Sequence, residues 1–387
     1  MFLYSRDEFK RIQNILDNDV FLNDESFINI LKSITRIDKD FDILKYYLEN
    51  LNKNEKVNFY SILLPFIFKA VILGYNKEFN TMQSNDGINE LKFTKLQVLT
   101  ILSNMFLCTI DQPIFEKEEI YNNINFIEIF NSQPEYHGYY SLDGEEKLNI
   151  TNQNDIKKIK IEKIKFILSY FNTIQNLQRI DRLDYRIVKF VKITNTELPK
   201  LNKQKLTDID ISNKKFEECD SMYSIFSSGY IGGAVLSNGC HKEEIISLIH
   251  PELLVACLFL DKINKYEAIQ VYGLNRYSSY TGYDIALQYK KINFSNLHLH
   301  NVTYINSYNA DRRFEILKTY NAFNVQDIIS ISIDKCNYIK FLIQWLAASL
   351  NNKKIIYCYR DSQITNIVEE FRNKSIMDLY LYIMKYN

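Results

Sequence analysis

The sequence predicts an α/β (α+β) fold, in which a helical first half precedes a second half of alternating strands and helices. One observation behind this prediction is the spacing of apolar residues at i, i+3 and i+4, which dominates up to about residue 195. The other is a change, beginning near Asp181, to short alternating or continuously apolar runs of the kind found in strands. We therefore expect a helical accessory region over residues 1–195 and an α/β core over residues 196–387.

Helices are expected throughout the first half. Thr94 is followed three positions later by Gln97, which is a capping-box pattern and predicts that a helix begins directly after Thr94. The segments with clear helical periodicity are residues 27–34, 41–51, 57–73, 95–107 and 159–174. A helix with this periodicity has one apolar face, so we expect these segments to pack on one another or on the core.

Strands are expected from the end of the first half onward. Residues 185–193 are rich in β-branched and aromatic residues, which favour strands. Residues 328–333 alternate between polar and apolar, whereas residues 268–272 and 355–359 read as buried strands. The helices expected between and after these strands cover residues 252–261, 312–323, 337–350 and two segments after residue 361.

Glycine is concentrated in one short stretch. The chain has only 10 glycines among 387 residues, yet Gly229, Gly232, Gly233 and Gly239 fall within eleven positions. A glycine-poor protein places glycine where the backbone needs a positive φ or must approach a ligand closely. This stretch is therefore the first candidate for a binding loop.

Two adjacent carboxylates, Glu243 and Glu244, follow at the expected start of a helix. A glycine-rich turn that leads into a helix offers unpaired backbone N–H groups to an anion. Carboxylates beside such an anion can do acid–base chemistry. The alternative is a plain loop followed by a helix whose first turn is acidic because of the helix dipole. Local evidence leaves both interpretations open.

Composition excludes several classes of protein. Lys+Arg and Asp+Glu are equal at 47 each, so no strong overall field favours nucleic acid as a partner. We find no stretch long and uncharged enough to span a bilayer, and no signal-peptide pattern, so we expect a protein of the cytoplasm or nucleus that is not secreted. The six cysteines include no C-x-x-C pair and the pair His298 and His300 has no completing ligands, so no metal is expected.

The glycine stretch resembles a known signature. Residues 232–244 read Gly-Gly-Ala-Val-Leu-Ser-Asn-Gly-Cys-His-Lys-Glu-Glu, which is similar to the poly(ADP-ribose) glycohydrolase family's three glycines, short spacer and Gln-Glu-Glu. Residues 245–259 continue the likeness, and Tyr277-Ser-Ser-Tyr-Thr-Gly-Tyr283 is similar to the family's tyrosine-rich clasp. Further similar segments bring the likeness to most of residues 55–370. The resemblance implies a macrodomain-like mixed sheet flanked by helices, with an N-terminal helical accessory region.

The resemblance also assigns roles to individual residues of the glycine stretch. It implies that Glu244 is the catalytic acid/base and that Glu243 helps to position the substrate. Gly232 and Gly233 would belong to the loop that lines the diphosphate. The ligand implied is poly(ADP-ribose) or an ADP-ribosylated protein.

Four residues outside that stretch receive roles from the same resemblance. Tyr283, and with it Tyr280, would cover the ribose–phosphate part of the ligand. Tyr359 falls where the family has an aromatic residue that stacks on adenine. Glu217 would meet the edge of the adenine.

The implied chemistry agrees with these residue types. Cleavage of a ribose–ribose O-glycosidic bond needs an acid for the leaving oxygen and stabilisation of an oxocarbenium-like centre. One glutamate can protonate the leaving group and then deprotonate the attacking water. Two adjacent carboxylates in a partly closed site tend to raise one pKa, which favours the protonated acid. Neither a metal ion nor a cofactor is implied.

The sequence departs from the family pattern at four places. Ala234 replaces the third glycine, Lys242 replaces the glutamine, and Ile225 replaces an acidic residue. The family's second glycine-rich loop is missing, because the expected strand runs through Asp334 almost directly into a helix. Asp334 would repel a diphosphate unless Lys335 or Lys242 compensates.

These departures keep two alternatives open. The chain could bind ADP-ribose chains, or a protein partner, without turnover. It could also be a structural protein that has kept only the fold. Cleavage from the end of a polymer or within it, and the oligomeric state, stay open as well.

Overall fold

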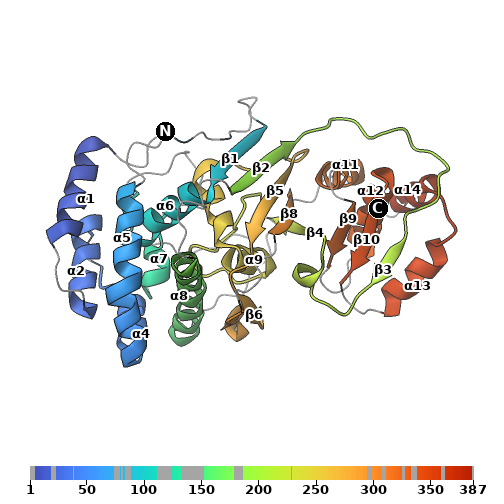
Figure 1. Ribbon diagram of the computed structural model, residues 1–387. Coiled ribbons are helices and arrows are strands. Elements are labelled where there is room, and N and C mark those ends of the chain that lie inside the picture. Colours follow the sequence, from blue (N-terminus) through green and yellow to red (C-terminus); the bar gives the residue numbers. More distant parts are fainter. Residues whose placement is uncertain are drawn as a thin grey trace.

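The computed structural model of the 387-residue chain describes residues 5–18, 23–37, 39–73, 79, 82, 89–110, 124–132, 152–177, 186–227, 229–293, 299–306, 311–324, 327–332, 338–358 and 362–385. The molecule is elongated, with N-terminal helices at one end, a sheet in the middle and C-terminal helices at the other end (Figure 1).

One mixed sheet forms the centre of the molecule. Its strands are β1 (Glu90–Thr94), β2 (Ile187–Ile193), β3 (Ile209–Ile211), β4 (Met222–Ser227), β5 (Ala268–Asn275), β8 (Leu299–Asn306), β9 (Ile328–Ile331) and β10 (Lys354–Tyr357). Within the described residues the order is β1-β2-β5-β8-β4-β9-β10-β3. Pairing is antiparallel from β1 to β8 and parallel from β8 to β3. A separate antiparallel pair, β6 (Ser279–Thr281) and β7 (Gln288–Lys290), forms a small hairpin.

The sheet separates two hydrophobic cores. Successive side chains of a strand point to opposite faces, and in β8 Tyr304 belongs to one core whereas Ile305 belongs to the other. In β5, Ile269 and Ala268 are divided in the same way. Burial on both faces explains why the first residues of β5, 268–272, are nearly all apolar in the sequence.

C-terminal helices cover one face of the sheet. They are α11 (Arg312–Ala322), α12 (Tyr338–Leu350), α13 (Ser362–Phe371) and α14 (Ile376–Lys385). Parallel strands need a crossover connection. Here α12 joins the neighbouring strands β9 and β10, and α11 joins β8 to β9 across the position of β4. Trp345 fastens α12 to the chain before β3, because its indole Nε1 donates to the carbonyl oxygen of Thr207 at 2.9 Å.

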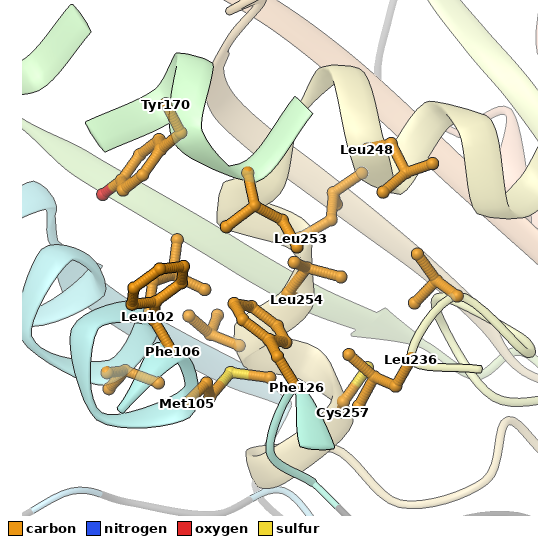
Figure 2. Packing of buried hydrophobic residues seen from close by; sticks show 14 of the residues in the cluster. Leu102, Met105, Phe106, Phe126, Tyr170, Leu236, Leu248, Leu253, Leu254 and Cys257 are labelled. Carbon is orange, nitrogen blue, oxygen red and sulfur yellow. The ribbon is translucent and has the colours of Figure 1, made fainter. Parts of the chain in front are cut away.

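The opposite face carries the helices that follow the glycine stretch and two helices of the first half. They are α9 (Lys242–Ile249), the 3-10 helix Pro251–Val255, α10 (Ala256–Phe259), α6 (Lys95–Phe106) and α8 (Gln153–Asn176). Figure 2 shows side chains of α6, among them Leu102 and Phe106, gathered against Leu253 and Leu254 of the 3-10 helix. The helical first half and the glycine stretch therefore share one core.

The remaining helices lie at the N-terminal end of the molecule (Figure 1). They are α1 (Arg6–Asn18), α2 (Asp24–Thr35), α3 (Asp42–Glu49), α4 (Lys53–Asn58), the π-helical turn Phe59–Leu63, α5 (Leu64–Leu73) and α7 (Ile127–Phe130). The predicted capping box is confirmed where α6 begins. The N–H of Gln97 donates to Thr94 Oγ1 at 3.1 Å, and the N–H of Thr94 donates to Gln97 Oε1 at 2.8 Å.

The predicted fold class, a mixed sheet flanked by helices with a helical N-terminal region, is confirmed. Two predicted elements are wrong in detail. Glu90–Thr94 is a strand, β1, where no strand was expected, and residues 252–261 contain a 3-10 turn and only four α-helical residues. The division between residues 195 and 196 stays a prediction, although β1 and β2 hydrogen-bond into the same sheet as the later strands.

The expectation that no segment could span a bilayer is wrong by length and composition. Lys53–Leu73 is a continuous helical run of 21 residues that contains an 18-residue window with a mean hydropathy of 1.6, and 39% of this window is buried. Core helices of globular proteins meet the same two criteria. Leu64, Ile67 and Val71 of this run are buried in the core that also contains Tyr304 of β8.

Candidate active site

The predicted site residues gather at one edge of the sheet. The parallel strands β4, β9 and β10 run toward this edge, where the register pairs Tyr357 with Ile331 and Tyr223 with Ser330, so that β4 continues past the ends of the other two strands to Ser227. In open α/β sheets, ligands bind in the crevice outside the carboxyl ends of the strands. The glycine stretch leaves β4 at this edge and leads into α9.

Gly233 brings the glycine loop against both carboxylates. Its φ is +47°, and a Cβ atom at this position would lie 2.6 Å from Glu244 Oε1 and 3.1 Å from Glu243 Oε2. Only a residue without a side chain fits here, because any Cβ would displace the carboxylate. The loop and the two glutamates are therefore in contact, as the sequence predicts.

Glu244 is held at one oxygen only. Its side chain belongs to the first turn of α9, and Oε1 accepts the backbone N–H of Ala234 at 3.1 Å. The residue is 5% exposed, and Oε2 has no hydrogen-bond partner among the described residues. A buried polar oxygen without a partner costs free energy, so such an atom in a native site indicates a place for a ligand or a water molecule.

Glu243 is positioned by Ser227, the last residue of β4. The hydroxyl oxygen of Ser227 lies 2.7 Å from Glu243 Oε1 and 2.8 Å from the carbonyl oxygen of Tyr230. A hydroxyl has one proton, and the bond to a carboxylate is the stronger of the two. Ser227 therefore ties the end of β4 to the start of α9.

The two tyrosines form a pair at the small hairpin. The hydroxyls of Tyr280 and Tyr283 lie 3.2 Å apart, with the rings edge to face. Tyr280 is buried, whereas Tyr283 is 47% exposed and can meet a ligand. The backbone N–H of Asp284 donates to the carbonyl oxygen of Cys240 at 3.3 Å, which ties this hairpin to the glycine loop.

Glu217 lies close enough to Tyr280 to act on it electrostatically. It is fully buried in the 3-10 helix Phe216–Glu218, and neither carboxylate oxygen makes a hydrogen bond of ordinary geometry within the described part of the chain. Burial and the charge of Glu217 raise the pKa of Tyr280 far above its usual value. Lys215 holds Tyr280 in place. Its ammonium lies 3.9 Å from the centre of the Tyr280 ring and donates to the Tyr280 carbonyl oxygen at 2.8 Å.

Lys242 reaches the end of β9. Its Nζ donates to the carbonyl oxygen of Ser332 at 2.9 Å and lies 4.1 Å from the centre of the Phe216 ring. The cation thus lies next to the place where the family's second glycine-rich loop would begin. Asp334 and Lys335, which were expected to act there, lie outside the described residues.

Seven of the eight predicted site residues fall in the described part of the chain. Gly233, Glu243 and Glu244 are in contact with one another, and Glu217, Tyr280 and Tyr283 form the neighbouring group. Gly232, with a φ of +93°, belongs to the same loop. Tyr359 lies outside the described residues, so its predicted place beside adenine stays a prediction.

Among the described residues, no group of three or more His, Cys, Asp and Glu side chains could hold a metal ion. A small surface hollow lies away from the carboxylates and contains none of the predicted site residues. It is lined by Met82, Lys192, Leu260, Asp261, Lys262, Glu267 and Ile269.

Sequence reasoning missed three residues that support the site: Ser227, Lys215 and Lys163. Ser227 precedes the first glycine of the stretch, and this position could have marked it. Lys215 and Lys163 had no such signal, because a lysine in a polar or helical segment usually faces solvent. Lys163 comes from α8 in the helical first half, far away in the sequence.

Comparison with known proteins adds a family relationship. Residues 51–192 match a model of the helical domain of poly(ADP-ribose) glycohydrolase, and residues 196–312 match a model of its macro domain fold. The chain is 30% identical over 139 residues to poly(ADP-ribose) glycohydrolase 1 of Caenorhabditis elegans, which covers 35% of the chain and 18% of the relative. It is 48% identical over 58 residues to poly(ADP-ribose) glycohydrolase 1 of Arabidopsis thaliana, which covers 15% of the chain and 11% of the relative. The chain thus aligns with less than a fifth of the length of each of these two relatives.

Proposed function

Because this chain belongs to the poly(ADP-ribose) glycohydrolase family, we propose that it hydrolyses the ribose–ribose O-glycosidic bonds of poly(ADP-ribose). The observation that carries the proposal is the hydrogen bonding of the two carboxylate oxygens of Glu244. One oxygen of this buried carboxylate is held by the loop, and the other has no hydrogen-bond partner among the described residues. Such a group is positioned and yet able to exchange a proton with a substrate.

In the proposed reaction Glu244 acts first as an acid and then as a base. Protonated Glu244 gives its proton to the oxygen that leaves with one ribose, as the bond from the anomeric carbon of the other ribose to that oxygen breaks. The electron pair of the bond stays on the leaving oxygen, and an oxocarbenium-like centre develops on the anomeric carbon. Water then attacks this carbon and gives a proton to Glu244, which restores the acid.

The neighbouring residues take supporting roles in this proposal. Glu243, held by Ser227, positions the ribose next to Glu244. The backbone of Gly232 and Gly233 lines the diphosphate, since N–H groups of a glycine-rich loop suit an anion.

The tyrosine side of the site would hold the rest of the nucleotide. Tyr283 is exposed enough to cover the ribose–phosphate part, and Tyr280 supports it from beneath. Glu217 would meet the adenine edge, and Tyr359 would stack on the adenine. The Glu217 carboxylate oxygens make no hydrogen bond of ordinary geometry within the described residues, and this supports the role given to Glu217.

A second candidate function is binding of ADP-ribose chains without turnover. The contact of Lys242 with Ser332, beside the missing second loop, favours this alternative. A lysine supplies charge to a diphosphate but not the fixed array of N–H groups that a glycine-rich loop provides. Weaker binding of the diphosphate would lower the rate of turnover before it abolished binding of the ligand.

Incubation with labelled poly(ADP-ribose) distinguishes the two candidates. The enzyme proposal expects release of ADP-ribose or shorter chains by the wild-type protein and no release by Glu244→Ala. Retention of labelled polymer on immobilised protein, without release by either protein, would establish the binding alternative and overturn the enzyme proposal.

A further inference from the structure

Lys163 is a buried cation that reaches the glycine loop from the helical first half. It lies on α8, which packs beside α9 (Figure 1). Its side chain is completely buried, and Nζ donates to the carbonyl oxygens of Val235 and Ser237 at 2.9 and 2.7 Å. Both acceptors belong to the loop that carries Gly233.

This arrangement is costly for stability alone. A buried ammonium without a close carboxylate partner loses its hydration, and an apolar side chain of similar volume would often be as stable or more stable. Burial lowers the pKa of Lys163, while the negative charge of nearby Glu244 acts in the opposite direction. Glu244 is thus near enough to feel the ammonium, although no direct contact joins the two.

The two carbonyls that Lys163 holds belong to the turn that follows Ala234, the residue whose N–H holds Glu244. Within this turn, the N–H of Val235 donates to the carbonyl of Gly232 at 2.9 Å, and the N–H of Ser237 donates to the carbonyl of Ala234 at 3.1 Å. Ala234 takes part in both turns, and its own N–H is the donor that holds Glu244 Oε1. Fixing the carbonyls of Val235 and Ser237 therefore fixes the direction of the Ala234 N–H.

We propose that Lys163 is a positioning residue through which the helical accessory region sets the glycine loop against Glu244. The catalytic consequence of this role, a lower rate when Lys163 is removed, rests on the proposed function. Its structural part, that the ammonium orders the loop, stands on the geometry alone.

Lys160 supplies a matched control on the same helix. It lies three residues before Lys163, is also completely buried, and also donates from Nζ to a backbone carbonyl, that of Asn131 at 2.5 Å. Asn131 belongs to the accessory region and not to the glycine loop. Lys160→Met and Lys163→Met therefore remove equivalent groups with different partners.

The test compares the two variants by hydrogen exchange and by steady-state kinetics on poly(ADP-ribose). We expect Lys163→Met to increase amide exchange in a peptide covering residues 229–240 by about tenfold, whereas Lys160→Met leaves that peptide unchanged. We expect Lys163→Met to lower kcat by about tenfold or more with KM within about threefold, whereas Lys160→Met keeps both within about twofold.

The outcomes test the positioning role of Lys163 separately from the proposed function. Unchanged exchange in the loop of Lys163→Met would overturn the inference, whether or not the wild-type protein has activity. An equal loss of kcat in both variants would also overturn it, because it would show a general effect of a damaged α8. An inactive wild-type protein with faster loop exchange in Lys163→Met alone would refute the proposed function and uphold the positioning role.

Discussion

Replacing Gly233 by alanine places a methyl group between the two carboxylates. The added Cβ would lie 2.6 Å from Glu244 Oε1 and 3.1 Å from Glu243 Oε2. Ordinary contacts between carbon and oxygen begin at about 3.3 Å, so the Glu244 carboxylate must move by roughly 0.7 Å. The movement takes Oε1 away from the N–H of Ala234, to which it is bonded at 3.1 Å.

The expected effect on activity is larger than the effect on stability. A misplacement of about 1 Å in a catalytic group can cost about 100-fold in rate. The bond from Ala234 is charge-assisted, and its loss costs about 1.5–3 kcal/mol. An alanine at a left-handed φ of +47° adds about 1–2 kcal/mol of strain. We therefore expect Gly233→Ala to lose about 100-fold in activity while it still folds.

Gly229→Ala is the control for backbone strain. Its φ of +104° is also unfavourable for alanine, but a Cβ there would meet the flexible side chain of Lys262 at 3.3 Å and neither carboxylate. The assay is release of ADP-ribose from poly(ADP-ribose) at saturating substrate, with thermal unfolding measured on the same preparations. Activity of Gly233→Ala within about threefold of the wild type, or an equal loss in Gly229→Ala, would refute the reasoning.

Three further predictions concern charges. Lys95→Met leaves fully buried Glu252 without its cation, so urea unfolding should show a loss of about 3–5 kcal/mol, and a loss below about 1 kcal/mol would contradict this. Burial lowers the pKa of Lys160 from 10.5 to about 8. Between these two pH values the unfolded chain binds more protons at Lys160 than the folded chain does, so the contribution of Lys160 to the free energy of unfolding rises with pH. Lys160→Met should remove this rise, of up to about 3 kcal/mol, and parallel pH curves for the two proteins would speak against it. Calorimetry should show weak binding of ADP-ribose that salt reduces strongly, because Lys242 supplies charge at the end of β9; tight binding unaffected by salt would show that the shortened second loop does not matter.

The sequence predicted those parts of the fold that local patterns encode. β5 and β10 could be predicted from their apolar runs, and β9 could be predicted from its alternation of apolar and polar residues. The start of α6 could be read because the side chains of Thr94 and Gln97 act only on neighbouring backbone groups. β1 could not, since it forms by pairing with β2, a strand about a hundred residues later in the chain.

The candidate site likewise has residues that local sequence predicts and residues that only distant contacts bring into place. Glu243 and Glu244 could be predicted because a glycine stretch and the following acids are adjacent in the sequence. Ser227 was missed because its place before the first glycine does not by itself show that its hydroxyl reaches Glu243. Lys163 was missed because its acceptors, in Val235 and Ser237, are more than seventy residues away along the chain.

The most direct test of the account compares Glu244→Gln with Glu243→Gln. Both changes keep the size of the side chain, and the glutamine oxygen at position 244 can still accept from the N–H of Ala234. If Glu244 supplies and removes the proton, Glu244→Gln should lose about 1,000-fold or more in turnover of poly(ADP-ribose) while its affinity for ADP-ribose stays within about threefold. Glu243→Gln should lose only about tenfold, because Glu243 positions the ribose and transfers no proton. Turnover by Glu244→Gln above about a tenth of the wild-type rate would contradict the central claim.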